Sequence, residues 1–298
     1  MMRGMKYTII LPFKNEASNL NGVLDSITSQ SLSPYEVLLI DDKSLDNSKT
    51  IINSYLMKYT YIKYFQYESK VDFYQLGGKI VNMFHYGMSL SDKSTEWIIK
   101  LDADIMFGSN FMEKISRKVT GKKYGIISGT PYEYINNKKI LDFSPIWHTH
   151  GQFKVYRVQC INEMGGLIPD LAWDGADNII ARSLGWETES FRDILYHHRR
   201  PTGSRNSKMT GRIKHGIGAY KLGQDGLYVT FRAIHDLVKY PVIIGSISML
   251  YGYLKAFFTN EKKILNKEQR KLARKLYWSS VLPRFKNKEY IFLQMREK

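Results

Sequence analysis

The sequence predicts a doubly wound α/β fold around a mostly parallel sheet, and two observations predict it. In the first half of the chain, short apolar runs alternate with segments of helical periodicity, which is typical of successive β–α–β units. Acidic clusters then directly follow two of these runs. In open α/β sheets, polar side chains that follow parallel strands lie at the edge of the sheet where ligands bind.

The first half of the chain is expected to alternate between strands and helices. The strands are expected at residues 7–11, 37–40, 62–67 and 97–101. Helices fit between them. The first is capped by Asn15 and carries Leu20, Leu24 and Ile27 on one face, the second carries Ile51, Ile52, Tyr55 and Tyr59, and the third runs from Gly77 to Met88.

After residue 104 the pattern is less regular. Helices are expected near residues 111–119 and 175–184, and strands at 125–129, 152–158 and 187–191. Residues 131–151, rich in Tyr, Asn and His, are expected to form one long loop. Loops of that length in compact domains often serve binding or catalysis.

The last third of the chain is basic and partly apolar. Residues 197–226 are basic and rich in Gly, and Pro241–Leu254 is mostly apolar. That apolar segment is too short for a membrane span and suits a buried or interfacial helix. Lys239, Lys255, Lys262 and Lys263 flank it, so two readings stay open: a helix at a membrane surface, or one packed on protein. Residues 261–298 predict an amphipathic helix.

Composition narrows the class of protein. Lys and Arg number 44 against 28 Asp and Glu, which gives a formal net charge of +16. This charge predicts an anionic partner, namely nucleic acid, a membrane surface or a phosphorylated substrate, with general solubility as the alternative. The single cysteine, Cys160, excludes a disulfide framework and a thiolate metal site. The N-terminus shows no signal-peptide pattern, so a cytoplasmic location is expected.

The two acidic clusters suit a nucleotide and a metal ion. Residues 41–46 read DDKSLD and residues 102–104 read DAD. The first can hold the base or ribose of a nucleotide by hydrogen bonds. The second, with Asp102 and Asp104 two residues apart, can hold Mg²⁺ or Mn²⁺, which take most of their remaining ligands from phosphate and water.

At this point the chain resembles the family 2 glycosyltransferases, which have the nucleotide-binding GT-A fold. Residues 9–16 (IILPFKNE) are similar to the first strand of the family and its Pro-x-x-Asn-Glu turn. Residues 41–46 resemble its Asp-Asp-x-Ser-x-Asp motif, although the family usually has Gly where this chain has Lys43. Residues 78–82 (GKIVN) resemble its Gly-Lys-x-x-x-Asn segment, and residues 102–104 its metal motif.

The resemblance implies roles for individual residues. Asp104 is implied as the main metal ligand, with Asp102 beside it. The nucleotide sugar is expected to meet Pro12, Asn15, Glu16, Asp42, Ser44, Gly78, Lys79, Asn82 and Asp102. The domain would span residues 5–225, with a nucleotide-binding half (5–110) and an acceptor half (111–225), followed by a helical extension, residues 226–298, that is membrane-associated on one of the two readings above.

The catalytic base is expected in a Trp-Asp-Gly-Ala-Asp segment. The family commonly has Glu-Asp before a helix that ends in Gly plus an aromatic residue, and that Asp acts as the base. Here Asp174 and Asp177 precede a helix that ends at Gly185. Trp173 replaces the usual Glu, so both aspartates stay candidates, with Asp174 preferred. Either could also serve as a helix N-cap.

Histidine and arginine follow the last expected strand. His197 or His198 could complete the metal site, as a histidine does near this place in related enzymes, or both could be solvated. Arg199 and Arg200 could clamp a diphosphate or a phospholipid headgroup. A plain solvated basic loop is the alternative.

These features predict a metal-dependent inverting glycosyltransferase. It would move a hexose from a nucleotide-diphosphate sugar to a lipid-linked or glycan acceptor at the cytoplasmic face of the cell membrane. Mn²⁺ or Mg²⁺ is the expected cofactor, an anionic membrane surface is an expected partner, nucleic acid is not, and oligomerisation stays open.

Two alternatives to this function are a nucleotidyltransferase and a nucleic-acid-binding protein. A nucleotidyltransferase would usually carry a glycine-rich basic loop after the first strand, whereas residues 12–16 read PFKNE. The net charge of +16 and the 21 tyrosines suggest a nucleic-acid-binding protein. The acidic strand ends argue against it, because without a metal ion they would repel phosphate.

Overall fold

The computed structural model describes residues 5–68, 77–120, 122–135, 137–142, 144–199, 208–238 and 243–281. The chain divides into two compact units, Met1–Pro169 with Leu184–Pro201, and Asp170–Ser183 with Thr202–Lys298. The boundary expected at residue 225 separates a catalytic domain from a helical extension by their functions, and it stays a prediction. The compact units assign residues 170–183 and 202–225 to the same unit as the C-terminal helices.

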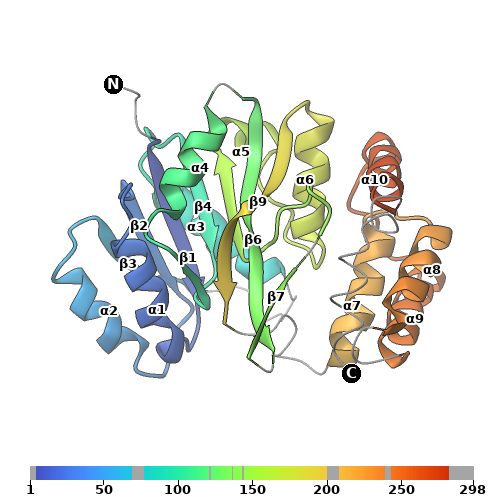
Figure 1. The fold of residues 1–298 in the computed structure, drawn as a ribbon, viewed down its shortest axis with the longest axis horizontal. Helices are drawn as coiled ribbons and strands as arrows, with labels where there is room; N and C mark the ends of the chain where they lie inside the picture. The colour runs from blue at the N-terminus through green and yellow to red at the C-terminus, as the bar shows by residue number, and fades with distance from the viewer. Residues whose placement is uncertain are drawn as a thin grey trace. The chain divides into compact units, whose positions relative to one another are not determined.

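The first unit contains the sheet (Figure 1). Among the described residues its strands are β1 (Tyr7–Phe13), β2 (Glu36–Asp41), β3 (Ile62–Gln66), β4 (Trp97–Leu101), β5 (Ile105–Phe107), β6 (Tyr124–Ile135), β7 (Lys138–Leu141), β8 (Phe153–Arg157) and β9 (Glu187–His198). Their order is β3-β2-β1-β4-β8-β6-β9-β5, and β7 pairs with β6 outside this path. Strands β3, β2, β1 and β4 are parallel, as are β6 and β9, whereas β8, β5 and β7 run antiparallel to their neighbours.

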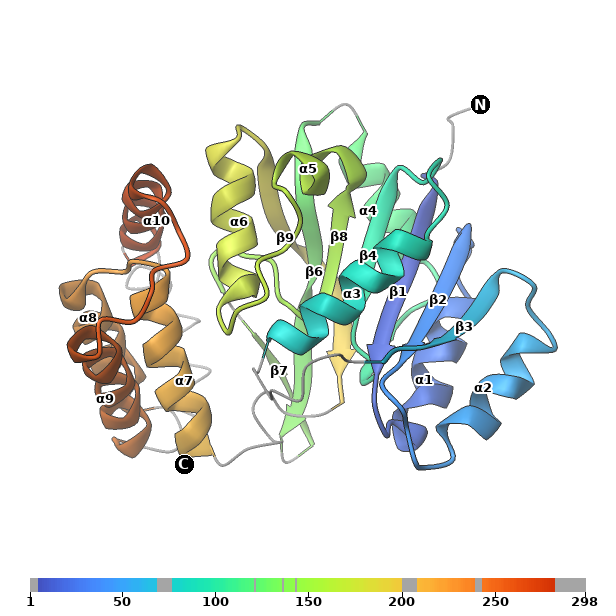
Figure 2. The ribbon, with the colours of Figure 1, turned by 180° about the vertical axis from the view of Figure 1, so that it is seen from behind.

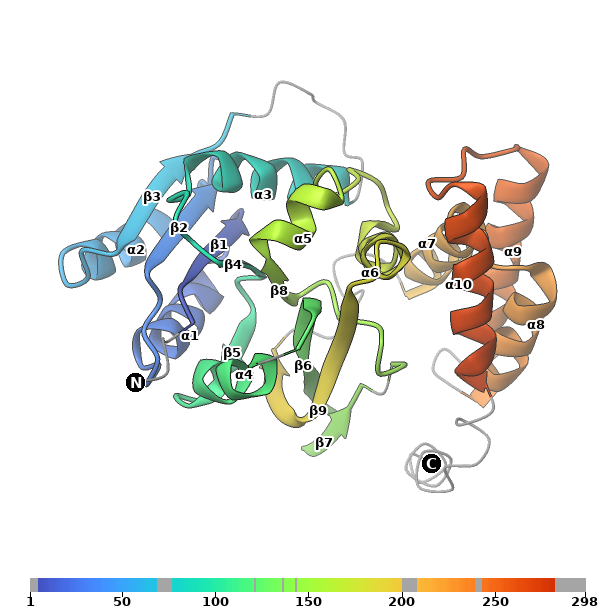
Figure 3. The same ribbon diagram turned by 90° about the horizontal axis from the view of Figure 1, so that it is seen from above.

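Helices cover both faces of this sheet. They are α1 (Ala17–Thr28), α2 (Ser48–Leu56), α3 (Gly78–Leu90), α4 (Phe111–Val119) and α5 (Val158–Glu163). Figure 2 shows α3 and α5 on one face, and the view from above in Figure 3 shows α1 and α4 on the other. The predicted doubly wound α/β architecture is therefore confirmed.

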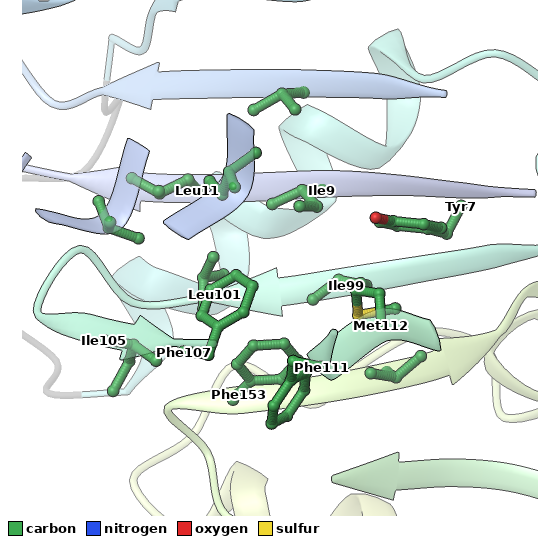
Figure 4. Packing of buried hydrophobic residues seen from close by; sticks show 14 of the residues in the cluster. Tyr7, Ile9, Leu11, Ile99, Leu101, Ile105, Phe107, Phe111, Met112 and Phe153 are labelled. Carbon is green, nitrogen blue, oxygen red and sulfur yellow. The ribbon is translucent and has the colours of Figure 1, made fainter. Parts of the chain in front are cut away.

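The core explains why the strands are continuous apolar runs. All residues of β1 and β2 are buried, as expected for parallel strands covered on both faces. On one face, Phe107, Phe111 and Phe153 form a cluster with ring centroids 4.8 to 5.3 Å apart (Figure 4). On the other face, α3 approaches β1 closely, since a Cβ atom at Gly87 would lie 2.5 Å from the side chain of Ile10.

The second unit is helical in its described residues. Its helices are α6 (Trp173–Ser183), α7 (Lys208–Lys221), α8 (Gly226–His235), η1 (Asp236–Val238), α9 (Ile244–Phe258) and α10 (Lys267–Ser279). Asn266 caps α10, because its side chain accepts from the Gln269 amide while the Gln269 side chain accepts from the Asn266 amide. In the described part of the chain, no helix combines the length and hydropathy needed to cross a membrane.

The strands and helices expected in the first half are confirmed, with two corrections. Helix α2 ends at Leu56, so Tyr59 lies beyond it. Asn15 does not cap the first helix: the N-cap position is Glu16. Asn15 instead has a φ of 52°, and its side-chain oxygen accepts a hydrogen bond from the amide of Leu45. Its side chain therefore ties together the two loops after β1 and β2.

The second half departs further from expectation. Residues 131–151 are not one long loop, because they contain the end of β6 and all of β7. The basic segment 197–226 begins with the end of β9 and contains helix α7. Strand β5 and helix α5 were also not expected, whereas α8 lies within the helical extension expected at residues 226–298. The apolar helix is α9, and the expected C-terminal amphipathic helix is α10; Pro241 and residues 282–298 lie outside the described residues.

Candidate active site

The parallel register brings the acidic motifs to one edge of the sheet. Phe13 at the end of β1 pairs with Asp41 at the end of β2, and β1 also pairs in parallel with β4. The residues that follow these strands therefore leave the sheet in the same direction. Asp42 follows β2, and Asp102 follows β4, as the sequence predicted.

Asp42 is a buried carboxylate between two lysines. Its Oδ2 atom lies 3.2 Å from Nζ of Lys14 and 2.5 Å from Nζ of Lys79. Lys14 follows β1, whereas Lys79 comes from the first turn of α3, which begins at Gly78. Three segments distant in sequence thus converge on one charge-assisted cluster. Both lysines remain partly exposed, so they can also face an anion bound beside Asp42.

Asp41 and Ser44 shape the loop that carries Asp42. Oδ1 of Asp41 accepts hydrogen bonds from the amide (2.9 Å) and the hydroxyl (2.6 Å) of Ser44. The Ser44 hydroxyl in turn accepts from the amide of Asn15, at 2.8 Å. Ser44 and Asn15 therefore hold the loops after β1 and β2 together, which gives both residues a structural role beside the predicted one.

Lys43, which stands where the resembling family usually has glycine, has an unusual backbone conformation. Lys43 has a φ of 53°, in the left-handed region. Glycine, the usual residue of the family at this place, adopts that conformation without strain, whereas a residue with a side chain does so at a cost. The loop therefore keeps the glycine-type conformation although the glycine is absent.

The other predicted nucleotide-binding residues lie around this loop. Pro12 is buried in β1, opposite Ile40 of β2. Glu16 is buried, and its carboxylate accepts a hydrogen bond from the Asn19 side chain at 2.7 Å. Asn82 lies on the exposed side of α3. The structure thus brings most of these residues to the same edge of the sheet, while their contact with a nucleotide stays a prediction.

Asp102 is held by a lysine that the sequence reading did not single out. Nζ of Lys100 contacts Oδ1 of Asp102 and also donates to the carbonyl oxygen of Gly151, at 2.8 Å. Although 31% of the Asp102 side chain is exposed, its desolvation by the surrounding protein raises the pKa of this carboxyl above its usual value. The nearby charge of Asp104 acts in the same direction, and Lys100 opposes it.

Asp104 and His198 meet because β5 pairs with β9. Asp104 directly precedes β5, and Ile105, the next residue, pairs with His198 at the end of β9. Nε2 of His198 lies 3.6 Å from Oδ2 of Asp104, and its Nδ1 lies 3.2 Å from Oε1 of Glu133. Burial alone would lower the pKa of His198, but the two carboxylates raise it to about 9.

His197 points into different surroundings. Its ring stacks on that of Tyr132, with centroids 5.1 Å apart and planes at 10°, and it meets Tyr134 edge-on. Burial lowers the pKa of His197, and Arg199 and His198 add to this. Of the two histidines predicted to bind metal, the structure brings His198 to Asp104. Arg199 donates to the carbonyl oxygen of Ser18 at 3.2 Å, and Arg200 lies outside the described residues.

The donor set around Asp104 fits a divalent cation. A carboxylate and an imidazole are both ligands of Mn²⁺ and related ions. The second ring nitrogen of His198 faces Glu133, the arrangement in which carboxylates orient metal-binding histidines. Within the described ranges, no group of three or more His, Cys, Asp or Glu side chains is placed to hold a metal ion. The pair therefore suits a cation that takes its remaining ligands from a diphosphate and water.

The two candidate bases lie in α6 of the second unit. Asp174 occupies the first turn of the helix and is partly exposed. Asp177 is buried, and its Oδ1 accepts from the amide of Asn178 at 2.7 Å and from the Asn178 side chain at 3.1 Å. Asp174 is thus the more exposed of the two aspartates.

Glu133 is a residue of this site that was not predicted from the sequence. It lies in β6, inside the segment expected to be a loop. The available signal was the Tyr-Glu-Tyr alternation of residues 132–134, since an acid between two aromatic residues is typical of a strand with one polar face. Lys14 and Lys100 were likewise not proposed as site residues.

Comparison with known sequences assigns the chain that forms this site to a known family. The family model for glycosyl transferase family 2 matches residues 8–173, more than half of the chain. The chain belongs to this family. It is 28% identical to an uncharacterized glycosyltransferase of Mycoplasma genitalium over 150 residues, 50% of this chain and 47% of that protein. It is also 28% identical to a cholesterol galactosyltransferase of Borreliella burgdorferi over 149 residues, 46% of this chain and 37% of that protein.

The fold is shared with solved glycosyltransferases. The mannosyltransferase PcManGT from Pyrobaculum calidifontis, solved with GDP-Man and Mn²⁺, has a TM-score of 0.58 at 14% identity. The similarity covers 99% of this chain and 84% of that one. At this identity the likeness shows the GT-A fold alone. The match to the two curated relatives spans about half of their length or less.

Proposed function

We propose that this family 2 protein is an inverting glycosyltransferase that uses a nucleotide-diphosphate sugar and a divalent cation. It transfers a hexose to a lipid-linked or glycan acceptor at the cytoplasmic face of the membrane. The observation that carries the proposal is the pairing of Asp104 with His198 on the same sheet that presents Asp42 between Lys14 and Lys79. One pair suits a cation and the other cluster suits a nucleotide.

In this proposal the protein binds the donor through two carboxylate sites. Asp42 accepts hydrogen bonds from the base or ribose, and Lys14 and Lys79 place positive charge beside the phosphates. Asp104 and His198 would hold Mn²⁺ or Mg²⁺, with Asp102 near by, and the ion would offset negative charge on the departing diphosphate. The cation-binding pair and the lysines therefore serve the same leaving group.

The acceptor needs a base, for which Asp174 is proposed. In an inverting transfer, the acceptor hydroxyl attacks the anomeric carbon as the nucleotide leaves from the opposite side. A carboxylate that takes the hydroxyl proton contributes roughly 10²–10⁴ in rate. The partial exposure of Asp174 and the burial of Asp177 favour Asp174 for this role.

Thermal shift against a panel of nucleotide-diphosphate sugars tests the proposal. A ligand at about 100 times its Kd stabilises the native state by roughly 2.7 kcal/mol, which is a shift of several degrees. We expect one sugar nucleotide to raise the Tm of the wild type with Mn²⁺ and to do so much less in EDTA. Asp104→Asn is the control and should lose the metal-dependent part of this increase in Tm. If no sugar nucleotide shifts the Tm with metal, while random oligonucleotides bind in a salt-dependent manner, the proposal is wrong.

A further inference from the structure

Helix α9 has its large apolar residues on the outside. Ile244, Ile247, Tyr251, Leu254 and Phe258 recur at helical spacing, and each is at least 50% exposed. In a helix of a water-soluble domain, such residues normally form the stripe that faces the core. In α9 the large apolar residues therefore lie on the exposed side instead of the buried side.

The buried side of α9 consists of small residues apart from Met249. It includes Gly245, Ser248, Gly252 and Ala256. Gly252 lies against α7, where an added Cβ atom would be 2.1 Å from the carbonyl oxygen of Ile213. Gly216 of α7 likewise allows close contact, because a Cβ atom there would be 2.0 Å from the carbonyl oxygen of Met249. Small residues inside and large apolar residues outside are the arrangement of helices that face lipid.

Helix α8 also exposes large apolar residues. Leu227, Phe231 and Ile234 recur at helical spacing and are each at least 42% exposed. The two helices pack against each other, and the amide of Ile243 donates to the carbonyl oxygen of Leu237 at 3.1 Å. Both residues of that bond are exposed as well. We call the exposed apolar residues of α8 and α9 named here, with Leu237 and Ile243, the apolar face.

The charge around the apolar face is one-sided. Between residues 226 and 260 the sequence holds one carboxylate, Asp236. Asp236 is buried and lies 3.2 Å from Nη1 of Arg212, so it contributes little negative charge at the surface. Lys255 is exposed on α9, one residue from Leu254, whereas just beyond the helix the exposed Glu261 and Lys262 are adjacent and offset each other. An anionic surface would meet no carboxylate along these helices.

We propose that the apolar face lies on an anionic lipid bilayer, with its aliphatic and aromatic side chains among the acyl chains and Lys255 at the headgroups. The helix is too short to span, so it would lie in the plane of the interface. This inference deepens the membrane location in the proposed function and names the surface responsible. A second copy of the chain is a poorer occupant, because the apolar face offers no carboxylate to pair with the Lys255 of a partner.

Vesicle co-sedimentation without any sugar donor tests this inference separately from catalysis. The full-length protein is mixed with vesicles of phosphatidylcholine containing about one-third phosphatidylglycerol. Ile247→Glu/Leu254→Glu replaces two exposed residues, so the helices should persist, and far-UV circular dichroism checks this. Met57→Glu/Leu184→Glu is the matched control, because both residues are exposed apolar residues of the other unit.

We expect the wild type and the control to bind the anionic vesicles, and binding to fall with salt. The α9 variant should bind about tenfold less or worse, and Lys255→Glu should weaken binding to anionic vesicles only. Equal binding by the folded α9 variant and the wild type would overturn the inference. So would a wild type that ignores vesicles but forms a dimer that the α9 variant dissolves in analytical ultracentrifugation. Neither result would affect donor binding measured by thermal shift.

Discussion

Nε2 of His198 lies 3.6 Å from Oδ2 of Asp104, although the two residues belong to distant parts of the sequence, next to β5 and at the end of β9. The antiparallel pairing of β5 with β9 creates this contact, because Ile105 and His198 are register partners. Glu133 then approaches the other ring nitrogen from β6. The carboxylate–imidazole–carboxylate series fixes the ring so that one nitrogen faces Asp104.

Glu133→Gln should weaken the binding of Mn²⁺ in the presence of a nucleoside diphosphate by about 10- to 100-fold, the usual cost of losing a residue that orients a metal-binding histidine. Asp104→Asn should weaken it more, because it removes a proposed ligand. Titration calorimetry of Mn²⁺ into protein saturated with nucleotide measures both. Unchanged affinity in Glu133→Gln would show that Glu133 serves the fold only.

The two aspartates of α6 should differ in their effect on turnover. Asp174→Asn should lower kcat by at least about a hundredfold, as expected for loss of a general base, with little change in donor affinity. Asp177→Asn should lower kcat less and stability more, because Asp177 is buried and hydrogen-bonded to Asn178. Steady-state kinetics of both variants measures the effect on kcat, and thermal unfolding measures the effect on stability. The reverse ranking of kcat would move the base to Asp177.

The nucleotide-binding half was predictable because its signals are local. Strands β1 and β2 are buried on both faces, so each appears in the sequence as an uninterrupted apolar run, and the carboxylates follow directly. Asp42 and Asp104 could therefore be placed at strand ends from the sequence alone. Lys79 and His198 were named only through the family resemblance, since they reach these carboxylates through the packing of α3 and the pairing of β9.

Several elements of the second half could not be predicted from the sequence, and the reasons are physical. Strand β6 extends past its apolar part into Tyr132, Glu133 and Tyr134, where one face is polar and only β7 and β9 supply pairing. Helix α7 was missed because glycine and basic residues weaken its helical pattern. Its contact with α9 depends on Gly216, whose missing side chain leaves no hydrophobic signal in the sequence.

Lys43 offers a test of the strained loop beside Asp42. Lys43→Gly removes the strain of a φ of 53° but adds freedom to the unfolded chain, so stability should change by less than about 1 kcal/mol. Lys43→Val should destabilise by about 1–2 kcal/mol relative to Lys43→Gly, because a β-branched residue tolerates this region poorly. Both variants lose the exposed ion pair with Glu68, so comparing their Tm values isolates the backbone effect. Equal Tm values for the two would contradict this account.

His85 should make the stability of the first unit depend on pH. Nε2 of His85 accepts a hydrogen bond from the amide of Leu167 at 3.0 Å, so it must be unprotonated, and burial lowers the pKa of His85 below its usual value. The unfolded chain takes up the proton near pH 6.5. The stabilisation is therefore complete above about pH 6.5 and is lost as pH falls toward the lower pKa of the folded state.

His85→Gln is the matched variant for this effect, because glutamine can still accept a hydrogen bond but does not titrate. Urea midpoints of the wild type and His85→Gln should be compared at about pH 7.5 and about pH 5.5, on either side of the ordinary histidine pKa. We expect the wild type to lose more stability than the variant between the two, since all other titrating groups are shared. If both proteins lose the same amount, His85 is not the group responsible.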